Sequence, residues 1–567
     1  MCGIHAVISS APIPALPVEL KSLLSHRGPD HFGQVRRALP FAKDDSEISL
    51  EFTSTVLALR GDHLARQPLE SAVSASVLCW NGEAWRVNGQ SIRSQNDGEL
   101  LLGILDAIDV PTASSRESHI LNVLRSVDGP FAFLFYDAQI RRLYFGRDRL
   151  GRRSLLVHAA EHGSSISFSS VADVPAASWK EVEASGIYSL DLSTRLATPQ
   201  GLILDTRVTK HAWIRSGGED MVSSIGHFNT ALPRPGQEPD LNSASEMLRH
   251  WLCESLKLRV LDISEPPNPL SGLDVRVAVL FSGGLDCTVL ARLAHEFVPC
   301  SQEIDLINVA FENPRQVAIN KTLAHREAGD IYEACPDRAT GRKAFAELKS
   351  VCPDRRWRFI AVNVPFEEAM SHKPRIVSLM HPHNTEMDLS IAFALYFSAR
   401  GIGHCYVDKP DWEPTPPVVA TPSRVLLSGL GADELFGGYA RHEAAFKAGG
   451  YARVIDELKL DISRIGQRNL GRDDRVMAHW GKEVRFPYLD EELVRFAISS
   501  PVWEKCDFQN PSHPAVIDPA KRILRVLADK LGIPGVAREK KRAIQFGSRT
   551  AKMESHTGRL RGTALIS

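Results

Sequence analysis

A thiol stands at the second position of the chain, in the opening stretch MCGIHAV. If Met1 is removed, Cys2 carries two reactive groups, a nucleophilic thiolate and a free α-amine. Because the reference pKa of an α-amine is about 8, this amine can relay the proton of the attacking sulfur. The position therefore makes Cys2 a candidate nucleophile, and the rest of the sequence decides whether it is one. The alternative is that Cys2 is a small buried hydrophobic residue, the usual fate of a free cysteine.

A second chemical stretch is VAVLFSGGLDCTVLARLAH, residues 277–295. Its Gly283 and Gly284 let backbone N–H groups turn toward one point, and a helix N-terminus follows, so the stretch predicts an anion site for phosphate. Asp286 is placed to hold Mg²⁺ or to contact a metal-bound phosphate. No Gly-Lys-Ser/Thr follows, so this is not a Walker A loop. Ser-Gly-Gly alone would be an ordinary tight turn, but the complete strand, loop and helix favour the phosphate site.

Short β-type runs before about Arg215 would position Cys2. Runs such as ASVLCWNGE, GPFAFLFYD and SISFSS are separated by Gly, Asp and Asn turn signals. Between them, DGELLLGILDAI has apolar residues at helical spacing. We expect a layered β-rich domain with helices packed on it.

The second half of the chain has a different pattern, in which helical segments alternate with the apolar strands VRVAVLF, IDLINVAF, RRWRFIAVNV and RVLLSGL. Strands that are buried on both faces and separated by helices predict a parallel α/β sheet. A polar stretch rich in Gly, Pro and Ser joins the two patterns and is typical of a linker. We therefore expect a first domain at residues 2–215, a linker at 216–243 and a second domain at 244–567.

The composition excludes several classes of protein. A chain of 567 residues exceeds one hydrophobic core, and its 67 basic and 68 acidic residues create no overall field for nucleic acid or a membrane. The nine cysteines form no Cys-x-x-Cys pair, so we expect neither a disulfide framework nor structural zinc. No signal peptide or membrane-spanning apolar run is present. These observations predict a soluble cytoplasmic protein.

The two candidate sites together resemble a known family. Ser-Gly-Gly-x-Asp after an apolar strand is similar to the pyrophosphate loop of ATP pyrophosphatases, which cleave ATP to AMP and pyrophosphate. Cys2 with HRGPD, LALRGD, QPL, WNGE, NDGE and GRDRLGRRSLL resembles the class II glutamine amidotransferase domain. The stretches SGLGADELFGGYARH and EVRFPYLD resemble the asparagine synthetase family. The resemblance implies an N-terminal-nucleophile αββα sandwich followed by an adenine-nucleotide α-hydrolase-like parallel α/β sheet domain.

The resemblance also implies roles for residues of the first domain. Cys2 would be the nucleophile, and the Asn81 side chain and the Gly82 N–H would form an oxyanion hole, whose donors are each worth roughly 3 kcal/mol. Arg60 would hold the α-carboxylate of glutamine. Its alternative is a surface arginine that pairs with Asp62, because the segment from Arg60 to Gln67 is shorter than in asparagine synthetases. The glutamine α-amine would be bound by Glu83 and Asp97.

The resemblance places ATP and Mg²⁺ in the second domain, outside the carboxyl ends of the strands. Asp433 and Glu434 would bind metal or the acceptor, or else are acids at a helix start. Lys541, in the basic run REKKRAIQFGSRTAK, would contact the phosphates, with Lys540 or Arg542 as alternatives. His5 has no derived role and is interpreted as a packing residue. The implied ATP-binding set is Leu280, Ser282, Gly283, Gly284, Asp286, Val309, Ser428, Gly429 and Lys541, and the implied metal ligands are Asp286 and Asp433.

Two positions depart from the family pattern. Asparagine synthetases usually carry a glutamate in SGEG, where this chain has Leu430, and a serine where it has Cys287. Two hypotheses therefore stand. The first is a glutamine- and ATP-dependent amide ligase that makes asparagine, with glutamine and aspartate as small-molecule substrates. The second is a synthetase-like protein with reduced or lost amide formation that acts as a binding or regulatory component. The oligomeric state does not follow from the sequence.

Overall fold

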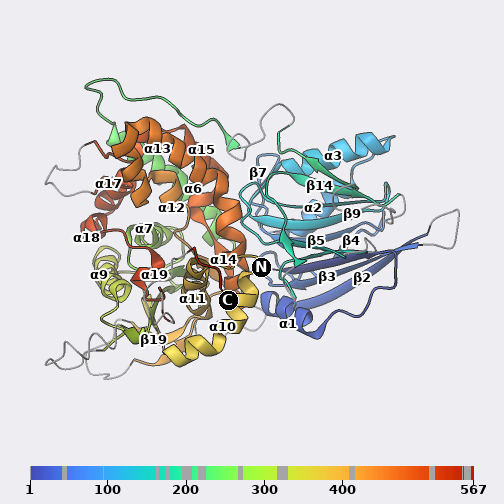
Figure 1. Ribbon diagram of the computed structural model, residues 1–567, viewed down its shortest axis with the longest axis horizontal. Helices are drawn as coiled ribbons and strands as arrows, with labels where there is room; N and C mark the ends of the chain where they lie inside the picture. Colours follow the sequence, from blue (N-terminus) through green and yellow to red (C-terminus); the bar gives the residue numbers. More distant parts are fainter. Residues whose placement is uncertain are drawn as a thin grey trace.

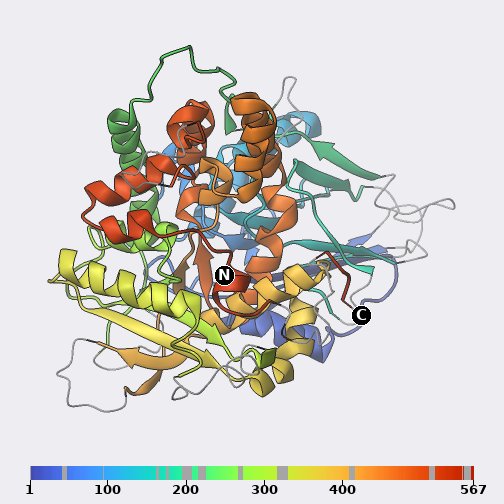
Figure 2. The ribbon, with the colours of Figure 1, turned by 60° about the vertical axis from the view of Figure 1, so that its left-hand side comes forward.

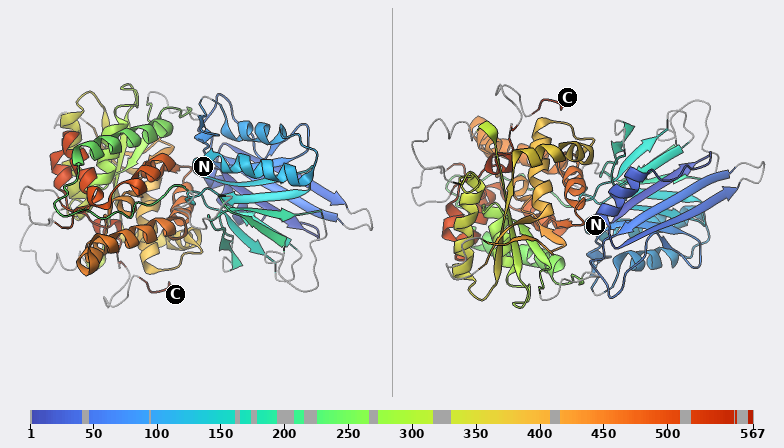
Figure 3. Two further views of the ribbon diagram at one scale, coloured as in Figure 1. Left: turned by 90° about the horizontal axis from the view of Figure 1, so that it is seen from above. Right: turned by 90° about the horizontal axis from the view of Figure 1, so that it is seen from below.

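The computed structural model shows two halves side by side, with the start of the chain at their junction (Figures 1 and 3). In the described part of the chain, no helix is long and apolar enough to cross a bilayer. Residues 216–224 of the predicted linker lie outside the described residues. The described residues are 2–40, 47–93, 95–160, 165–173, 178–193, 207–214, 225–265, 273–315, 330–407, 416–509, 518–551, 553 and 563–566.

Two antiparallel six-stranded sheets stack face to face in the first half. Alternation along the strands fills the space between the sheets: Ile4, Ala6 and Ile8 on one strand point into this core. One sheet has the order β13 (Lys180–Glu181), β11 (Leu156–Ala159), β12 (Ser165–Ser169), β1 (Gly3–Ser9), β3 (Glu47–Val56), β2 (His31–Pro40). The other has the order β15 (Val208–His211), β14 (Ile187–Asp191), β10 (Arg142–Arg147), β9 (Phe131–Asp137), β5 (Val77–Gly82), β4 (Leu69–Glu70).

Helices cover the outer faces of both sheets, which confirms the expected αββα sandwich. The helix α1 (Val18–Arg27) packs on β1 and β3, while α2 (Asp97–Asp106) packs on β4 and β5. The side chain of Asn96 caps α2 by accepting from the N–H of Glu99. The remaining elements of this half are α3 (Ala113–Arg125) and a small sheet of β7 (Gln90–Ser91), β6 (Arg86–Val87) and β8 (Val127–Asp128).

A seven-stranded sheet forms the centre of the second half. Five neighbouring strands are parallel, as the apolar runs predict, but the last two pairings at one edge are antiparallel, so the sheet is mixed. All eight residues of Ile304–Phe311 are buried, because helices cover both faces. The strand order is β20 (Val418–Ala420), β19 (Ile402–Tyr406), β18 (Trp357–Val364), β17 (Ile304–Phe311), β16 (Val277–Leu280), β21 (Val425–Leu427), β22 (Glu483–Arg485).

Helices surround this sheet on both sides (Figure 2). Helix α11 is almost wholly buried and ends at Gly401, which adopts a left-handed conformation. The helices are α6 (Leu241–Val260), α7 (Leu285–Ala294), α9 (Pro336–Val351), α10 (Phe366–Met380), α11 (Glu386–Arg400), α12 (Ala432–Phe436), α13 (Ala440–Arg468), α14 (Leu470–Ala478), η2 (Pro487–Leu489), α15 (Glu491–Ser499), α16 (Val502–Lys505), α17 (Arg522–Lys530), α18 (Pro534–Arg538) and α19 (Ile544–Gly547).

Buried ion pairs join the two halves. Arg152 pairs with Glu491, and Arg27 donates to Asp474 at 2.8 Å. The same Asp474 carboxylate accepts from the N–H of Ser154 at 3.1 Å. Breaking a buried pair by removing one partner typically costs about 3–5 kcal/mol. The halves are therefore held together by contacts that are expensive to lose.

Candidate functional site

Cys2 lies immediately before β1, at the junction of the two halves. Its backbone nitrogen donates to Oδ1 of Asn81 at 3.1 Å, and its carbonyl accepts from Nε of Arg27. The Nε2 atom of Gln67 lies 3.8 Å from the sulfur. Burial raises the pKa of the Cys2 thiol above its usual value. A base close to the sulfur is therefore needed to produce the thiolate.

Asn81 sits at the end of β5, next to Cys2, and is fully buried. Its Nδ2 has no hydrogen-bond partner among the described residues, which is costly for a buried donor. A developing oxyanion would satisfy this donor. Gly82 follows directly, where a Cβ atom would lie 2.2 Å from the carbonyl oxygen of Pro130. The glycine is therefore required by packing, whatever its part in catalysis.

Arg60 is buried, and the structure decides between its two interpretations. It donates to Glu83 at 3.2 Å and to the carbonyl of Ala84 at 2.9 Å, whereas Asp62 pairs with His63. The alternative of a surface arginine paired with Asp62 is therefore wrong. Arg60 instead stands beside the two acids predicted to bind the α-amine of glutamine.

Those acids, Glu83 and Asp97, are both buried near Cys2. Burial and the neighbouring carboxylate of Glu483 raise the pKa of Glu83 to about 7, against the pull of Arg485 and Arg60. Burial also raises the pKa of Asp97, whose Oδ2 accepts from Ala84 N at 2.7 Å and from the Trp80 indole. The structure thus brings all six predicted residues of the first domain together.

The predicted nucleotide residues line a cavity of about 720 Å³ at the carboxyl ends of the parallel strands. Leu280 and Val309 contribute apolar walls, and Ser428 and Gly429 follow β21. Gly283 is not among the described lining residues. It has φ +78°, and a Cβ there would lie 2.5 Å from the backbone of Gly341, so this glycine allows the loop to pack against α9.

The loop after β16 leaves through the N-terminus of α7, as expected. The Oγ of Ser282 accepts from the N–H of Gly284 at 3.3 Å and lies 3.6 Å from the sulfur of Cys287. The thiol of Cys287 donates to the Gly284 carbonyl, and burial raises its pKa, so it behaves as a neutral donor where the family has serine. The thiol thus contacts the loop at both Ser282 and Gly284.

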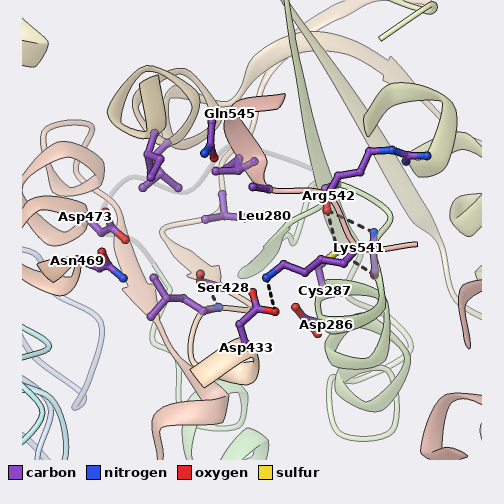
Figure 4. A pocket seen from close by; sticks show the side chains of 18 of the residues that line it. Leu280, Asp286, Cys287, Ser428, Asp433, Asn469, Asp473, Lys541, Arg542 and Gln545 are labelled. Atoms are coloured by element: carbon purple, nitrogen blue, oxygen red, sulfur yellow. Dashed lines mark hydrogen bonds and ion pairs between the residues drawn. The ribbon is translucent and has the colours of Figure 1, made fainter. Parts of the chain in front are cut away.

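Two aspartates and two lysines form an ionic cluster in this cavity, and Figure 4 shows Asp286, Asp433 and Lys541 of this cluster. Lys521 Nζ lies 2.6 Å from carboxylate oxygens of both Asp286 and Asp433, and Lys541 Nζ lies 2.7 Å from Asp433. Burial opposes ionisation of Asp433, but the two lysines outweigh it and lower its pKa to about 2. The arrangement presents cations where phosphate oxygens would enter.

Lys540 and Arg542, the alternatives to Lys541, also line the cavity. Arg542 donates to Oγ1 of Thr340 at 2.9 Å. Lys541 differs from its neighbours because its ammonium group reaches Asp433 and stands over the ring of Tyr439. Lys541 therefore belongs to the ionic cluster, and its contact with the phosphates stays a prediction.

Leu430 lines the cavity beside Ser428, to whose Oγ it donates its backbone N–H at 3.3 Å. Glu434 is buried and accepts from the hydroxyl of Tyr439 at 2.5 Å. Burial and the charge of Asp433 raise the pKa of Glu434. Both acids lie in the first turn of α12, so the interpretation as helix-start acids stays open beside that of metal or acceptor binding. Asn469 and Asp473 enter from the wall opposite Asp286 and Lys541 (Figure 4).

Among the described residues, no group of three or more His, Cys, Asp and Glu is placed to hold a metal ion. Asp286 and Asp433 supply two carboxylates that face the same cavity. Mg²⁺ commonly binds through one or two carboxylates together with the phosphates of its substrate. The residues therefore fit a magnesium ion that arrives with ATP, rather than a resident metal.

Sequence reasoning missed Lys521, Gln67 and Arg485. Lys521 stands 235 residues from Asp286 in the chain and in no recognisable phosphate motif. The only indication of such a residue is that two buried carboxylates require a cation nearby. Gln67 lies in QPL and Arg485 in EVRFPYLD, two stretches that resemble the family. Neither stretch indicated that Gln67 contacts Cys2 or that Arg485 contacts Glu83.

Comparisons with known proteins match both halves. The family described as a glutamine amidotransferase domain matches residues 1–212, and the family described as asparagine synthase matches residues 418–456 and 446–564. Asparagine synthetase domain-containing protein 1 of Mus musculus is 34% identical, with 98% of this chain and 97% of that protein covered. Its Homo sapiens counterpart is 32% identical, at 98% and 96%. A putative glutamine-hydrolysing asparagine synthetase 1 of Methanocaldococcus jannaschii is 35% identical, at 98% and 94%.

Proposed function

The chain belongs to the family of asparagine synthetase domain-containing proteins, and on that premise we propose that it is a glutamine- and ATP-dependent amide ligase. The observation that carries the proposal is the buried Asn81 amide, whose oxygen holds the nitrogen of Cys2 while its Nδ2 has no partner among the described residues. This arrangement suits a nucleophile and an oxyanion donor. The product proposed for the second half is asparagine, formed from aspartate.

In the first half, the thiolate of Cys2 attacks the side-chain amide carbon of glutamine. The α-amine of the processed chain takes the thiol proton and later passes it to the leaving ammonia. Asn81 Nδ2 and the Gly82 N–H stabilise the oxyanion. Arg60 binds the α-carboxylate, and Glu83 with Asp97 binds the α-amine. Water then hydrolyses the thioester and releases glutamate.

In the second half, the cavity binds ATP and the carboxylate that it activates. Lys521 and Lys541 bind phosphate oxygens and withdraw negative charge as pyrophosphate leaves. Asp286 and Asp433 would hold a magnesium ion that neutralises the phosphate chain when bound. Ammonia from the first half then attacks the adenylated carboxyl carbon, which releases AMP and forms the amide.

Leu430 favours a second candidate, a protein of reduced amide-forming activity that serves as a binding or regulatory component. A leucine side chain cannot accept the proton of the incoming ammonia, and general bases typically contribute about 10²–10⁴-fold. Glu434 lines the same cavity but is engaged by Tyr439. The first step, ATP cleavage, does not depend on this proton transfer.

The test is pyrophosphate release from ATP in the presence of aspartate and glutamine, with asparagine measured in the same samples. We expect pyrophosphate release that falls at least tenfold in Asp286→Asn with little change in melting temperature. Pyrophosphate without asparagine would support the second candidate. Absence of pyrophosphate with every candidate acid would contradict a ligase, and a steep loss of stability in Asp286→Asn would show that this residue is structural.

A further inference from the structure

One sequence stretch contacts both candidate sites and has no role in the chemistry above. It comprises residues 483–491, which contain β22 and η2, and we name it the bridging segment. It begins at Glu483 and ends at Glu491, the first residue of α15. The segment belongs to the second half, but it lies against the first.

On the glutaminase side, Arg485 reaches the predicted glutamine site. Its Nη2 donates to Oε1 of Glu83 at 3.1 Å, and its guanidinium stands 5.0 Å from the centre of the Trp85 ring. At the other end of the segment, Oε1 of Glu491 accepts from the N–H of Gly129 at 3.0 Å. The segment is thus anchored to the first half at both ends.

On the nucleotide side, the same residue holds the cavity wall. The carbonyl of Arg485 accepts from the N–H of Ser428 at 3.0 Å. The hydroxyl of Tyr488 donates to the backbone carbonyl of Asp286 at 3.2 Å. Leu489 packs closely against Gly431: a Cβ atom on Gly431 would lie 2.6 Å from Cδ2 of Leu489. Arg485 therefore touches one site with its side chain and the other with its backbone.

Glutamine must compete for the carboxylate that Arg485 binds. Arg60 donates to Oε2 of Glu83, and Arg485 donates to Oε1, so both oxygens are engaged by arginines. A glutamine that placed its carboxylate on Arg60 and its ammonium on Glu83 would redistribute these bonds. Arg485, Tyr488 and Leu489 are buried, and close-packed side chains have little free space in which to move independently. A shift of the Arg485 side chain should therefore also shift the backbone of the segment.

We propose that the bridging segment couples the two sites, with Arg485 positioning Glu83 for glutamine and Ser428 for the nucleotide. The proposal rests on the proposed function for its ligands, but its contacts exist without them. Coupling between two binding sites is reciprocal. If nucleotide changes the affinity for glutamine by some factor, glutamine must change the affinity for nucleotide by the same factor. Couplings of this kind are typically about 5–150-fold.

The experiment compares four variants of the full chain. Arg485→Met removes the charge, and Arg485→Lys keeps a cation. Glu83→Gln removes the partner in the other half. Arg424→Met is the matched control, because Arg424 also pairs across the junction, with Asp30 at 2.6 Å, but it contacts neither Glu83 nor Ser428 in the described structure. Melting temperature shows which variants are folded.

The first measurement is amide hydrogen exchange of the peptide that contains Ser428, which requires no ligand. We expect exchange several-fold faster in Glu83→Gln and Arg485→Met than in the native chain, and native exchange in Arg424→Met. A native rate in a folded Glu83→Gln would overturn the proposal, since a change in one half would then not reach the other. If Arg485→Met does not fold, Glu83→Gln decides the matter.

The second measurement is the KM for glutamine with and without ATP. We expect ATP to change this KM several-fold in the native chain and in Arg424→Met, to do so less in Arg485→Lys, and to leave it unchanged in Arg485→Met. An equal response to ATP in Arg485→Met and the native chain would also overturn the proposal. A native chain that hydrolyses no glutamine would instead refute the proposed function, and the exchange measurement would still test the coupling.

Discussion

The backbone nitrogen of Cys2 donates to the side-chain oxygen of Asn81 at 3.1 Å. The bond occupies the amide oxygen, while Nδ2 of the same side chain has no hydrogen-bond partner in the described part of the structure. One buried side chain can therefore hold the α-amine that moves the proton and offer a donor to the oxyanion. The two functions are separable by substitution.

Replacing Asn81 tests this division. Asn81→Asp keeps an acceptor for the nitrogen of Cys2 but loses the donor, and Asn81→Ala loses both. We expect kcat for glutamine hydrolysis to fall about 10²–10³-fold in Asn81→Asp and further in Asn81→Ala, with a small effect on KM. Steady-state ammonia release measures it. Native kcat in a folded Asn81→Asp would mean that another group stabilises the oxyanion.

Cys2→Ala should abolish glutamine hydrolysis, because the attacking sulfur is gone. Ammonia-dependent ATP cleavage should persist, since the cavity lies in the second half. Ammonia and pyrophosphate are measured in one preparation, and loss of both from a folded variant would contradict the separation of sites.

Intact-mass analysis should find the mature chain beginning at Cys2, and Met1 retained on every molecule would argue against the α-amine as proton relay.

Lys521→Met should destabilise the protein and weaken ATP binding. The substitution leaves Asp286 and Asp433 as neighbouring buried carboxylates without their shared cation, which costs about 3–5 kcal/mol. Denaturant unfolding and ATP titration calorimetry measure the two effects. The double variant Lys521→Met/Asp433→Asn should recover part of the stability but not the ATP affinity. Full recovery of both would show that the lysine only neutralises the acids.

The KM for glutamine should fall as the pH rises through about 7. Burial and Glu483 raise the pKa of Glu83 from 4.5 to about 7, so its carboxylate, which attracts the glutamine ammonium, forms only above that pH. The same raised pKa means that this group lowers folding stability as the pH rises from 4.5 to about 7. Glu83→Gln should remove the pH dependence of KM. A KM independent of pH in the native chain would exclude Glu83 as the ammonium ligand.

Asparagine synthesis by the native chain should be slow, and Leu430→Glu should raise it. The leucine gives the cavity an apolar wall where the family usually has a carboxylate. The assay compares asparagine formed from aspartate, ATP and glutamine by the two proteins, with Leu430→Gln as an isosteric uncharged control. Rapid synthesis by the native chain would show that another group, such as Glu434, accepts the proton, and the proposed deficit would have to be dropped.

The sequence predicted local structure well where the hydrophobic pattern was strong. The runs GPFAFLFYD and IDLINVAF both indicated their strands, Phe131–Asp137 and Ile304–Phe311. The antiparallel edge of the second sheet was not predicted, because Ile402–Tyr406 is short, contains Gly403 and shows no sign of its direction. Strand direction depends on a partner elsewhere in the chain.

The candidate sites followed the same rule. Cys2 and Asp286 lie in stretches whose residue types carry their own chemistry, so the sequence indicated them. Lys521 and Arg485 act through partners 235 and 402 residues away, and an isolated lysine or arginine has no local signature for such a contact. The sequence therefore indicated the residues of the local motifs but not Lys521 and Arg485, which pair with their carboxylates from distant parts of the chain.

The carboxylate of Asp474 in the second half, which binds Arg27 and Ser154 of the first, constrains how the gene can diverge. A substitution of Asp474 leaves the buried guanidinium of Arg27 without its carboxylate partner. Such a substitution should therefore persist only together with a compensating change at a distant position in the sequence. Covariation between these positions should therefore be visible across homologues. A chimera that joins this first half to a distant relative's second half should misfold unless the relative also supplies an acid at that position.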